Sequence, residues 1–343
     1  MTGKEAILAA MSLTETERAP AMYFGGGMWT AYQAGETLES LAADAKHMAE
    51  VIIRIAEEIQ NPIVYCGSGY NNLLAAAVGG KLKYRPHGAP DIVEPALRDW
   101  AELDTLDATA VDRNDTVNTI WKATEIVARR IGDRFMVTTT SWGPFTLASQ
   151  ICGMEPLMRG TFREKDRIHQ LLAFAAELIY RYYDPLLTRG TIETVCITDS
   201  VASGSLISRK QFAEFALPPL QQFTRKMRRK GVKTLLHICG DTNDRLDLLP
   251  ETGADIISID TNTDLAKARE ATRGKLCLGG NLSPVTLMLQ GTPKMIEAQG
   301  RTVIESLGRG GGFILMPGCD IAANAPRPNV EALLRTAAAT PVA

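Results

Sequence analysis

The stretch Lys233-Thr-Leu-Leu-His-Ile-Cys-Gly240 is an apolar run that ends in two soft metal ligands. Side chains alternate faces along an extended strand, so a strand here would point His237 and Cys239 to the same side. A second apolar run, Gly312-Phe-Ile-Leu-Met-Pro-Gly-Cys-Asp320, places Cys319 at the end of another expected strand. A neutral imidazole and two thiolates are a typical zinc ligand set, and three protein ligands leave a fourth position open for chemistry.

Working outward, strand-like apolar segments alternate with helical segments along the whole chain. The expected strands cover residues 20–24, 63–67, 134–140, 193–199, 233–239, 255–259, 275–279 and 312–316. Continuous apolar strands are typical of parallel sheets that are covered on both faces. Eight such units predict an α/β fold, a closed TIM (β/α)8 barrel, with an open doubly wound sheet as the alternative.

The expected helices separate these strands. They cover residues 4–11, 38–60, 70–80, 115–131, a helical hairpin over 145–190, 208–230, 241 to about 253, and 329–338, with further helix starts at Ser283-Pro284 and Thr292-Pro293. We predict one domain over residues 1–343, with an N-terminal helical extension and an irregular excursion at about 81–113. The run Gly25–Gly27 lacks the pattern of a dinucleotide fingerprint, and no helix with a phosphate-facing register is expected after it, so we interpret it as backbone that gives room at a site.

In a TIM barrel, functional sites lie at the carboxyl ends of the strands. Six candidate residues fall at that end: Trp142, Asp199, His237, Cys239, Asn281 and Cys319. A lone His-x-Cys pair is a weak signal, because a buried structural histidine is commoner than a metal ligand. From spacing alone, a structural histidine and a zinc site therefore both stay open, although the shared position at strand ends favours the metal.

Composition excludes several classes of protein. The chain has 343 residues, of which 45% are hydrophobic and 22% charged, and its net charge of −2 shows no basic excess for nucleic acid or membrane surfaces. No apolar run approaches the roughly 20 residues that span a bilayer. The N-terminus lacks the charged-then-apolar order of a signal peptide, so we expect a cytoplasmic protein with reduced thiols. Three cysteines inside apolar runs, Cys66, Cys196 and Cys277, are expected to be small core residues.

Several motifs resemble those of the uroporphyrinogen decarboxylase superfamily. They are His237-Ile-Cys-Gly-Asp241, Gly279-Gly-Asn-Leu-Ser-Pro284, Pro317-Gly-Cys319, Gly143-Pro-Phe-Thr-Leu-Ala148 and the segment 208–218. The resemblance runs through most of the chain and is strongest after residue 140. Within that superfamily, His-x-Cys with a distant Cys marks the corrinoid-linked methyltransferases, which include methylcobamide:coenzyme M methyltransferases and relatives acting on chloromethane and methoxylated aromatics. The resemblance implies a TIM barrel and zinc held by His237, Cys239 and Cys319.

The chain departs from the decarboxylases of that superfamily. These carry an N-terminal arginine pair and an aspartate after the second strand, whereas residues 22–29 contain no arginine and residues 66–72 no carboxylate. A tetrapyrrole with several carboxylates needs cationic partners, so porphyrinogen decarboxylation is a disfavoured alternative. A non-catalytic zinc-binding scaffold is a further alternative. Coenzyme M enzymes usually have a Glu-rich segment near Asn71–Ala75, which this chain lacks, so the sequence names neither a fourth zinc ligand nor a thiol acceptor.

The resemblance implies a zinc-dependent methyltransferase that moves a methyl group between a small methylated substrate, a methoxy compound or a thiol, and the cobalt of a corrinoid. The corrinoid would cycle between methylcobalamin and cob(I)alamin, and the direction of transfer stays open, although demethylation is favoured. Corrinoid-binding modules carry an Asp-x-His-x-x-Gly motif. None of His47, His87, His169 and His237 lies in that context, so the corrinoid is expected on a partner protein docked at the barrel mouth.

Aromatic and methionine side chains are expected to line the mouth and hold a planar methoxyarene. These candidates are Tyr23, Met28, Trp29, Tyr70, Trp142, Phe145 and Met316, several of which are alternatively barrel core. Asp199 and Asn281 are the expected catalytic residues, which would orient the substrate by hydrogen bonds. Asp199 could equally cap the loop that follows it.

Overall fold

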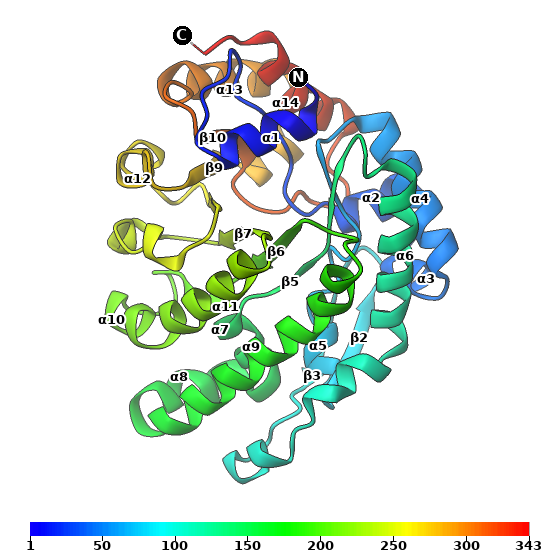
Figure 1. Cartoon of the computed structure of the whole chain (residues 1–343), viewed down its shortest axis with the longest axis vertical. Coiled ribbons are helices and arrows are strands. Elements are labelled where there is room, and N and C mark those ends of the chain that lie inside the picture. Colours follow the sequence, from blue (N-terminus) through cyan, green and yellow to red (C-terminus); the bar gives the residue numbers. More distant parts are fainter. Residues whose placement is uncertain (343) are drawn as a thin grey trace.

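Parallel strands surround a central core in the computed structural model of the chain, which describes residues 1–342 (Figure 1). The strands are β1 (Ile63–Tyr65), β4 (Met136–Thr138), β5 (Thr140–Trp142), β6 (Thr194–Thr198), β7 (Lys233–Ile238), β8 (Ile256–Ile259), β9 (Cys277–Leu282) and β10 (Phe313–Pro317). One sheet has the order β10-β9-β8-β7-β6-β5, and β1 pairs with β4. Since β4 and β5 are separated by Thr139 alone, they are two halves of one strand.

The first expected strand, 20–24, is reduced to a single parallel bridge between Ala21 and Leu315. There Met22 N donates to Leu315 O at 3.1 Å, and Leu315 N donates to Pro20 O at 2.9 Å. This bridge joins the start of the barrel to β10, its last strand. The predicted TIM barrel is therefore confirmed, although its first strand makes fewer ladder hydrogen bonds than the others.

A side chain, and not a strand ladder, joins the segment 20–24 to β1. The buried Asn61 amide accepts from Tyr23 N at 3.0 Å and donates to Ile63 O at 2.7 Å. Backbone groups buried between two strands need partners, and one amide can supply both a donor and an acceptor. Asn61 thus substitutes for the missing ladder at this junction.

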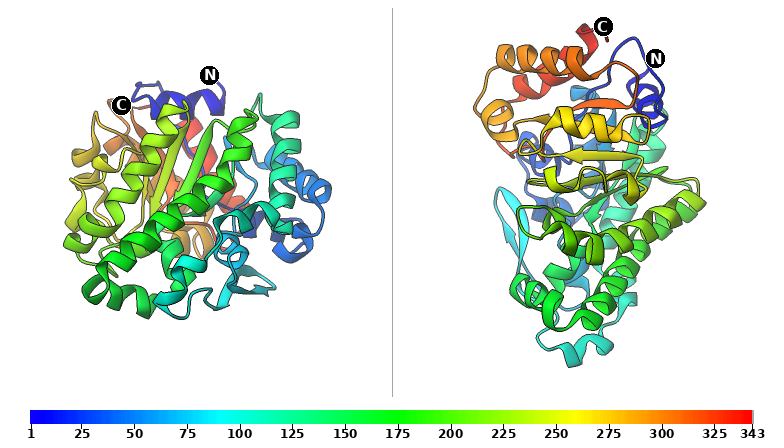
Figure 2. Two further views of the ribbon diagram at one scale, coloured as in Figure 1. Left: turned by 60° about the horizontal axis from the view of Figure 1, so that its bottom comes forward. Right: turned by 90° about the vertical axis from the view of Figure 1, so that its left-hand side faces the viewer.

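Helices lie around the strands, with α1 (Gly3–Met11) packed against the barrel interior (Figure 2). They are α1 (Gly3–Met11), α2 (Gly27–Gln33), α3 (Leu38–Ala42), α4 (Ala45–Ile59), α5 (Leu73–Ala77), α6 (Asp115–Ile131), α7 (Pro144–Cys152), α8 (Met154–Arg163), α9 (Lys165–Thr188), α10 (Arg209–Gln211), α11 (Leu217–Arg229), α12 (Leu265–Thr272), α13 (Pro293–Leu307) and α14 (Arg327–Ala339). Ile7, Ala10 and Met11 of α1 join the apolar cluster that fills the barrel interior. In the described part of the chain, no helix is both long enough and apolar enough to cross a membrane.

Several expected elements differ from the structure. The helix expected over 38–60 is two helices, because Asp44 Oδ1 accepts from the backbone N–H groups of Lys46 and His47 and starts α4. A helix, α2, does begin inside the glycine run at Gly27. Instead of a helix over 241–253 there are short 3-10 turns at Asn243–Arg245 and Pro250–Thr252. The helix α12 was not expected.

The excursion expected at 81–113 is not irregular throughout. Its first part is an antiparallel hairpin of β2 (Lys81–Arg85) and β3 (Gly88–Glu94), followed by 3-10 helices at Trp100–Thr105 and Ala108–Arg113. The exposed face of β2 carries the lysines and Arg85, so its polar-apolar alternation matches a two-stranded ribbon on the surface. The division of the chain into one domain with an excursion stays a prediction.

The Asn61 junction can be tested by substitution. Asn61→Ala should lower the free energy of unfolding by about 2–4 kcal/mol, because it leaves buried backbone groups on both sides without partners. Asn118→Ala is the control. The Asn118 amide also donates to backbone carbonyls, but it is half-exposed, so water can take over its hydrogen bonds when it is removed. Urea unfolding followed by circular dichroism measures both. Equal losses in the two variants would contradict the proposed role of Asn61.

Candidate metal centre

Two strand ends bring together three side chains of kinds that can ligate a metal. His237 lies on β7, Cys239 follows that strand directly, and Cys319 follows β10. His237 Nε2 is 3.0 Å from Cys239 Sγ, which is 3.5 Å from Cys319 Sγ, and all three ligand atoms lie within 4.8 Å of one another. A tetrahedral ion with bonds of about 2.0–2.3 Å keeps its ligand atoms about 3.5–3.7 Å apart, so small side-chain movements suffice to admit one.

The imidazole of His237 is buried and held on both sides. Its Nδ1 lies 3.0 Å from Ser258 Oγ on the neighbouring strand β8, and the Phe24 ring packs against it with centroids 4.8 Å apart. This arrangement directs Nε2 toward the cysteines. Burial alone would lower the pKa of His237, but the charge of Cys239, its hydrogen bond and the more distant Asp260 outweigh burial and raise the pKa.

The two cysteines divide one negative charge unequally. Hydrogen bonding from the Cys319 thiol, together with His237 and the Ser200 hydroxyl, lowers the pKa of Cys239 to about 4 despite its burial. The same hydrogen bond and burial raise the pKa of Cys319. Without a cation the pair is therefore a thiolate beside a thiol. A cation with an affinity for sulfur would displace the remaining proton.

A cavity of about 170 Å³ opens onto the triad. It is lined by Phe24, Met28, Gly69, Asn71, Asn72, Ala89, Trp142, Thr198, Ser200, His237, Cys239, Cys319 and Asp320. Phe24, Met28 and Trp142 form apolar walls, while Asn72 Oδ1 accepts from Trp142 Nε1 at 2.5 Å. Neither lysine nor arginine occurs among these lining residues. The Thr198 hydroxyl is buried and, within the described structure, has no hydrogen-bond partner.

The carboxylate of Asp320 lies against the glycine run. Gly26 N donates to Asp320 Oδ1 at 2.6 Å, and a Cβ atom added at Gly25 would come within 2.7 Å of Asp320 Cγ. Burial raises the pKa of Asp320 to about 7. The interpretation of the glycine run as backbone that gives room at a site holds at Gly25, where the room is taken by the cavity residue Asp320, whereas a Cβ atom at Gly26 or Gly27 would meet Tyr23 or the Ser68 carbonyl.

Comparison with known proteins identifies the family. The uroporphyrinogen decarboxylase (URO-D) family model matches residues 2–340. The chain belongs to the uroporphyrinogen decarboxylase family. This confirms the resemblance seen in its motifs.

Within the family, the chain is similar to methyltransferases over nearly its whole length. It is 27% identical to the methylcobamide:CoM methyltransferase MtbA of Methanosarcina mazei over 332 residues, 96% of this chain and 92% of that protein. It is 27% identical to the uroporphyrinogen decarboxylase of Chlorobaculum parvum over 222 residues, 63% of this chain and 61% of that protein. A solved methyltransferase structure from Methanosarcina mazei superposes with a TM-score of 0.87 at 23% identity over 98% of both chains, which shows the shared fold.

The two residues predicted to be catalytic, Asp199 and Asn281, lie outside the lining of the cavity. Asp199 is buried, and its Oδ1 accepts from both the backbone N and the Oγ1 of Thr146, at 2.7 Å each. Burial raises the pKa of Asp199 to about 6 against these hydrogen bonds. The Asn281 amide donates to the carbonyls of Asp260 and Thr263 at 3.1 and 3.0 Å. Neither lines the cavity, and their catalytic role stays a prediction.

The predicted substrate-binding residues divide into two groups. Met28 and Trp142 line the cavity. Tyr23, Trp29, Tyr70, Phe145 and Met316 are buried outside that lining. The Trp29 indole donates to Ala325 O at 2.8 Å and the Tyr70 hydroxyl to Leu38 O at 2.5 Å, so both polar ends are already satisfied by backbone.

Several cavity residues were not among the residues predicted for the site: Phe24, Asn71, Asn72, Thr198, Ser200 and Asp320. Asp320 could have been predicted from the sequence, because it directly follows Cys319 after an expected strand. Ser200 follows an expected strand end in the same way. The three cysteines expected in the core, Cys66, Cys196 and Cys277, are free thiols and are buried, which confirms that prediction.

The close approach at Gly25 yields a test. Gly25 and Gly35 both have left-handed backbone, with φ of 67° and 74°, but nothing lies within 4 Å of a Cβ added at Gly35. Each substitution by alanine should cost about 1–2 kcal/mol of stability for the backbone. Only Gly25→Ala should also displace Asp320, and with it Cys319, and so weaken metal binding.

Chelator competition on both variants separates the two effects. Equal metal affinity in Gly25→Ala and Gly35→Ala would show that the contact with Asp320 does not support the triad.

Proposed function

We propose that this protein is a zinc-dependent methyltransferase that moves a methyl group between a small methylated substrate and the cobalt of a corrinoid carried by a partner protein. The observation that carries the proposal is the triad of the buried His237 and the half-buried Cys239 and Cys319 on the wall of an open cavity. The similarity of the chain to a methylcobamide:CoM methyltransferase, over 96% of its length, supports the same class of reaction.

The donor set fits zinc. One imidazole nitrogen and two sulfurs converge, and Ser258 fixes the far nitrogen of the imidazole, as a second partner of a metal-bound histidine usually does. When bound here, zinc would stabilise negative charge on a thiol sulfur or ether oxygen at its open position. The surrounding residues hold the ligands, and Phe24, Met28 and Trp142 exclude water from the reacting atoms.

The cavity favours a small uncharged substrate. Its volume of about 170 Å³ is below the range of roughly 300–1,000 Å³ typical of drug-sized ligands. Apolar walls suit a methoxy compound or a thioether, and the free Thr198 hydroxyl can bind one polar group of it. An anionic ligand such as coenzyme M would meet the Asp320 carboxylate and no cation among the lining residues. We therefore favour demethylation of an uncharged methyl donor, with Met28 and Trp142 as substrate contacts.

Asp199 and Asn281 contribute to this proposal as supports of the cavity wall. Asp199 holds the start of α7, beside Trp142, and Asn281 holds the loop after β8 that contains Asp260. Their side chains thereby orient the substrate indirectly, through the loops that they fix.

The corrinoid is proposed to arrive on a separate protein. The chain offers no Asp-x-His-x-x-Gly motif, and the cavity opens beside Ala89 of the β2–β3 hairpin, on the side where a docked corrinoid would reach the triad. The decarboxylase alternative is not favoured, because the lining residues provide no cation for a polycarboxylate. A non-catalytic scaffold is not favoured either, because a purely structural site has all four positions occupied by protein.

Metal content tests the ligand set. Purified protein should contain about one zinc per chain, and both Cys239→Ala and Cys319→Ala should lose it while circular dichroism shows a folded barrel. Cys152→Ala, at a buried thiol outside the triad, should retain the metal. Elemental analysis by mass spectrometry measures the zinc. Stoichiometric zinc in the Cys239→Ala/Cys319→Ala double variant would contradict the proposed ligand set.

Cobalt methylation tests the reaction. With free cob(I)alamin in excess, uncharged methyl ethers or thioethers should yield methylcobalamin, and methyl-coenzyme M should react far more slowly. Ala89→Arg should reduce the rate by at least about tenfold, about 1.4 kcal/mol in the barrier, without loss of zinc. Phe162→Arg, at an exposed position on α8, is the matched control. A normal rate in Ala89→Arg would contradict methyl transfer at this mouth of the cavity. Corrinoid bound tightly to the purified chain would contradict the proposal that a partner protein carries it.

A further inference from the structure

Two loops that follow neighbouring strands meet beside the triad. The loop after β6 spans 199–208 and carries Ser200, and the loop after β7 spans 239–245 and begins with Cys239. Ser200 Oγ donates a hydrogen bond to Cys239 Sγ at 3.2 Å. The contact joins a side chain outside the triad to one of its sulfurs.

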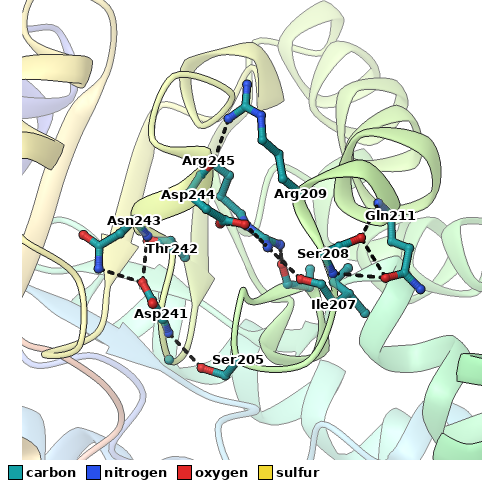
Figure 3. A network of polar contacts seen from close by, with 12 residues as sticks. Ser205, Ile207, Ser208, Arg209, Gln211, Asp241, Thr242, Asn243, Asp244 and Arg245 are labelled. Atoms are coloured by element: carbon teal, nitrogen blue, oxygen red, sulfur yellow. Dashed lines mark hydrogen bonds and ion pairs between the residues drawn. The ribbon is translucent and has the colours of Figure 1, made fainter.

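A buried arginine fastens the two loops together (Figure 3). Arg245 has no exposed surface, and its Nη1 and Nη2 donate to the carbonyls of Ala202 and Ile207 at 2.7 Å each. The Asp244 carboxylate accepts from Arg245 Nε at 2.7 Å and from Nη2 at 3.0 Å. A planar guanidinium fixes several acceptors at once, so one side chain holds both ends of the Ser200 loop.

Further hydrogen bonds connect the same two loops. Asp241 N donates to Ser205 Oγ at 3.1 Å, and Gly204 N donates to Asp241 O at 2.6 Å. Outside the clamp, Arg209 Nη1 and Nη2 bind the two carboxylate oxygens of Asp247 at 2.6 and 2.7 Å. The position of Ser200 relative to Cys239 is thereby fixed by backbone and side-chain contacts together.

We propose that Ser200 is a positioning residue that acts through the Cys239 sulfur, and that Arg245 holds it in place. This inference rests on the proposed metal site. The other neighbours of Cys239 Sγ, His237 and Cys319, belong to the triad and turn to the metal when it binds. Ser200 does not, so its hydrogen bond persists in the loaded site.

The hydrogen bond has a chemical consequence. A donor to a thiolate withdraws electron density from the sulfur, and such outer partners tune the ligand's electron donation. Cys239 consequently gives less electron density to the metal, which keeps more positive charge for the ligand that enters from the cavity. Cys239 itself also becomes a weaker nucleophile, which protects it from methylation by the substrate.

Cobalt(II) bound in place of zinc provides the test. In Ser200→Ala the sulfur-to-cobalt charge-transfer band should move to longer wavelength, because the sulfur is more electron-rich, and Ser200→Thr should restore its position. Thr198→Val is the matched control, since its hydroxyl lines the same cavity but contacts no sulfur. In the zinc-loaded proteins, iodoacetamide should alkylate Cys239 several-fold faster in Ser200→Ala than in the wild type, as measured by peptide mass spectrometry.

The outcomes separate this inference from the proposed function. A wild-type protein that binds no cobalt would overturn the metal site and this inference with it. A wild-type cobalt spectrum that Ser200→Ala leaves unchanged, or that Thr198→Val shifts equally, overturns this inference alone.

The clamp has its own test. Arg245→Lys keeps the charge but cannot hold both carbonyls, so the band should move part of the way toward its position in Ser200→Ala. If that variant does not fold, Ser205→Ala, which removes the acceptor of the Asp241 N–H, should give a smaller shift in the same direction. An unchanged band in whichever folded variant is measured overturns the role of the clamp.

Discussion

The contact between Cys239 and Cys319 depends on the curvature of the closed barrel. Their strands, β7 and β10, are separated in the sheet by β8 and β9. In a flat sheet, three strand spacings of about 4.8 Å would hold them about 14 Å apart. The sulfurs are instead 3.5 Å apart, because curvature turns both strand ends toward the barrel axis, where the following loops complete the approach. Every property of the candidate site that involves both cysteines follows from this closure.

Closure also determines which neighbours surround the triad. The junction at Asn61 and the bridge between Ala21 and Leu315 place the first segment beside the last strand. The Phe24 ring then lies on the imidazole of His237, and the glycine run meets Asp320. The N-terminal segment thus packs against the imidazole of His237, in the second half of the chain, and against Asp320, which follows Cys319 near the other end. A substitution that loosens this junction should therefore affect the candidate metal site as well as the stability of the fold.

The strands and the clustering of His237, Cys239 and Cys319 were easier to predict from the sequence than the lining of the cavity. Alternation along β7 predicts that His237 and Cys239 share a face, and parallel strand order predicts that Cys319 joins them. The role of Asn61 could not be predicted, because it depends on a backbone gap that appears only when the ring closes. The missing helix after Asp241 has a local cause: Asp241 Oδ1 accepts from the backbone N–H and the amide of Asn243, which fixes a turn. That Trp29 and Tyr70 lie outside the cavity lining could not be predicted, because a hydrophobic pattern does not reveal whether an indole or phenol faces a cavity or a backbone carbonyl.

The charge of the site limits what it can accept. Two thiolates and a neutral imidazole balance a divalent cation, so the loaded triad would carry no formal charge. The Asp320 carboxylate beside it, with no lysine or arginine among the lining residues, then leaves the cavity neutral to negative. Burying an unpaired anion there costs several kcal/mol, whereas an uncharged ether or thioether loses little hydration on entering apolar walls. The Ser200 hydrogen bond acts against this excess of negative charge. By withdrawing electron density from Cys239 it would leave more positive charge on a bound metal, without adding a cationic side chain to the cavity.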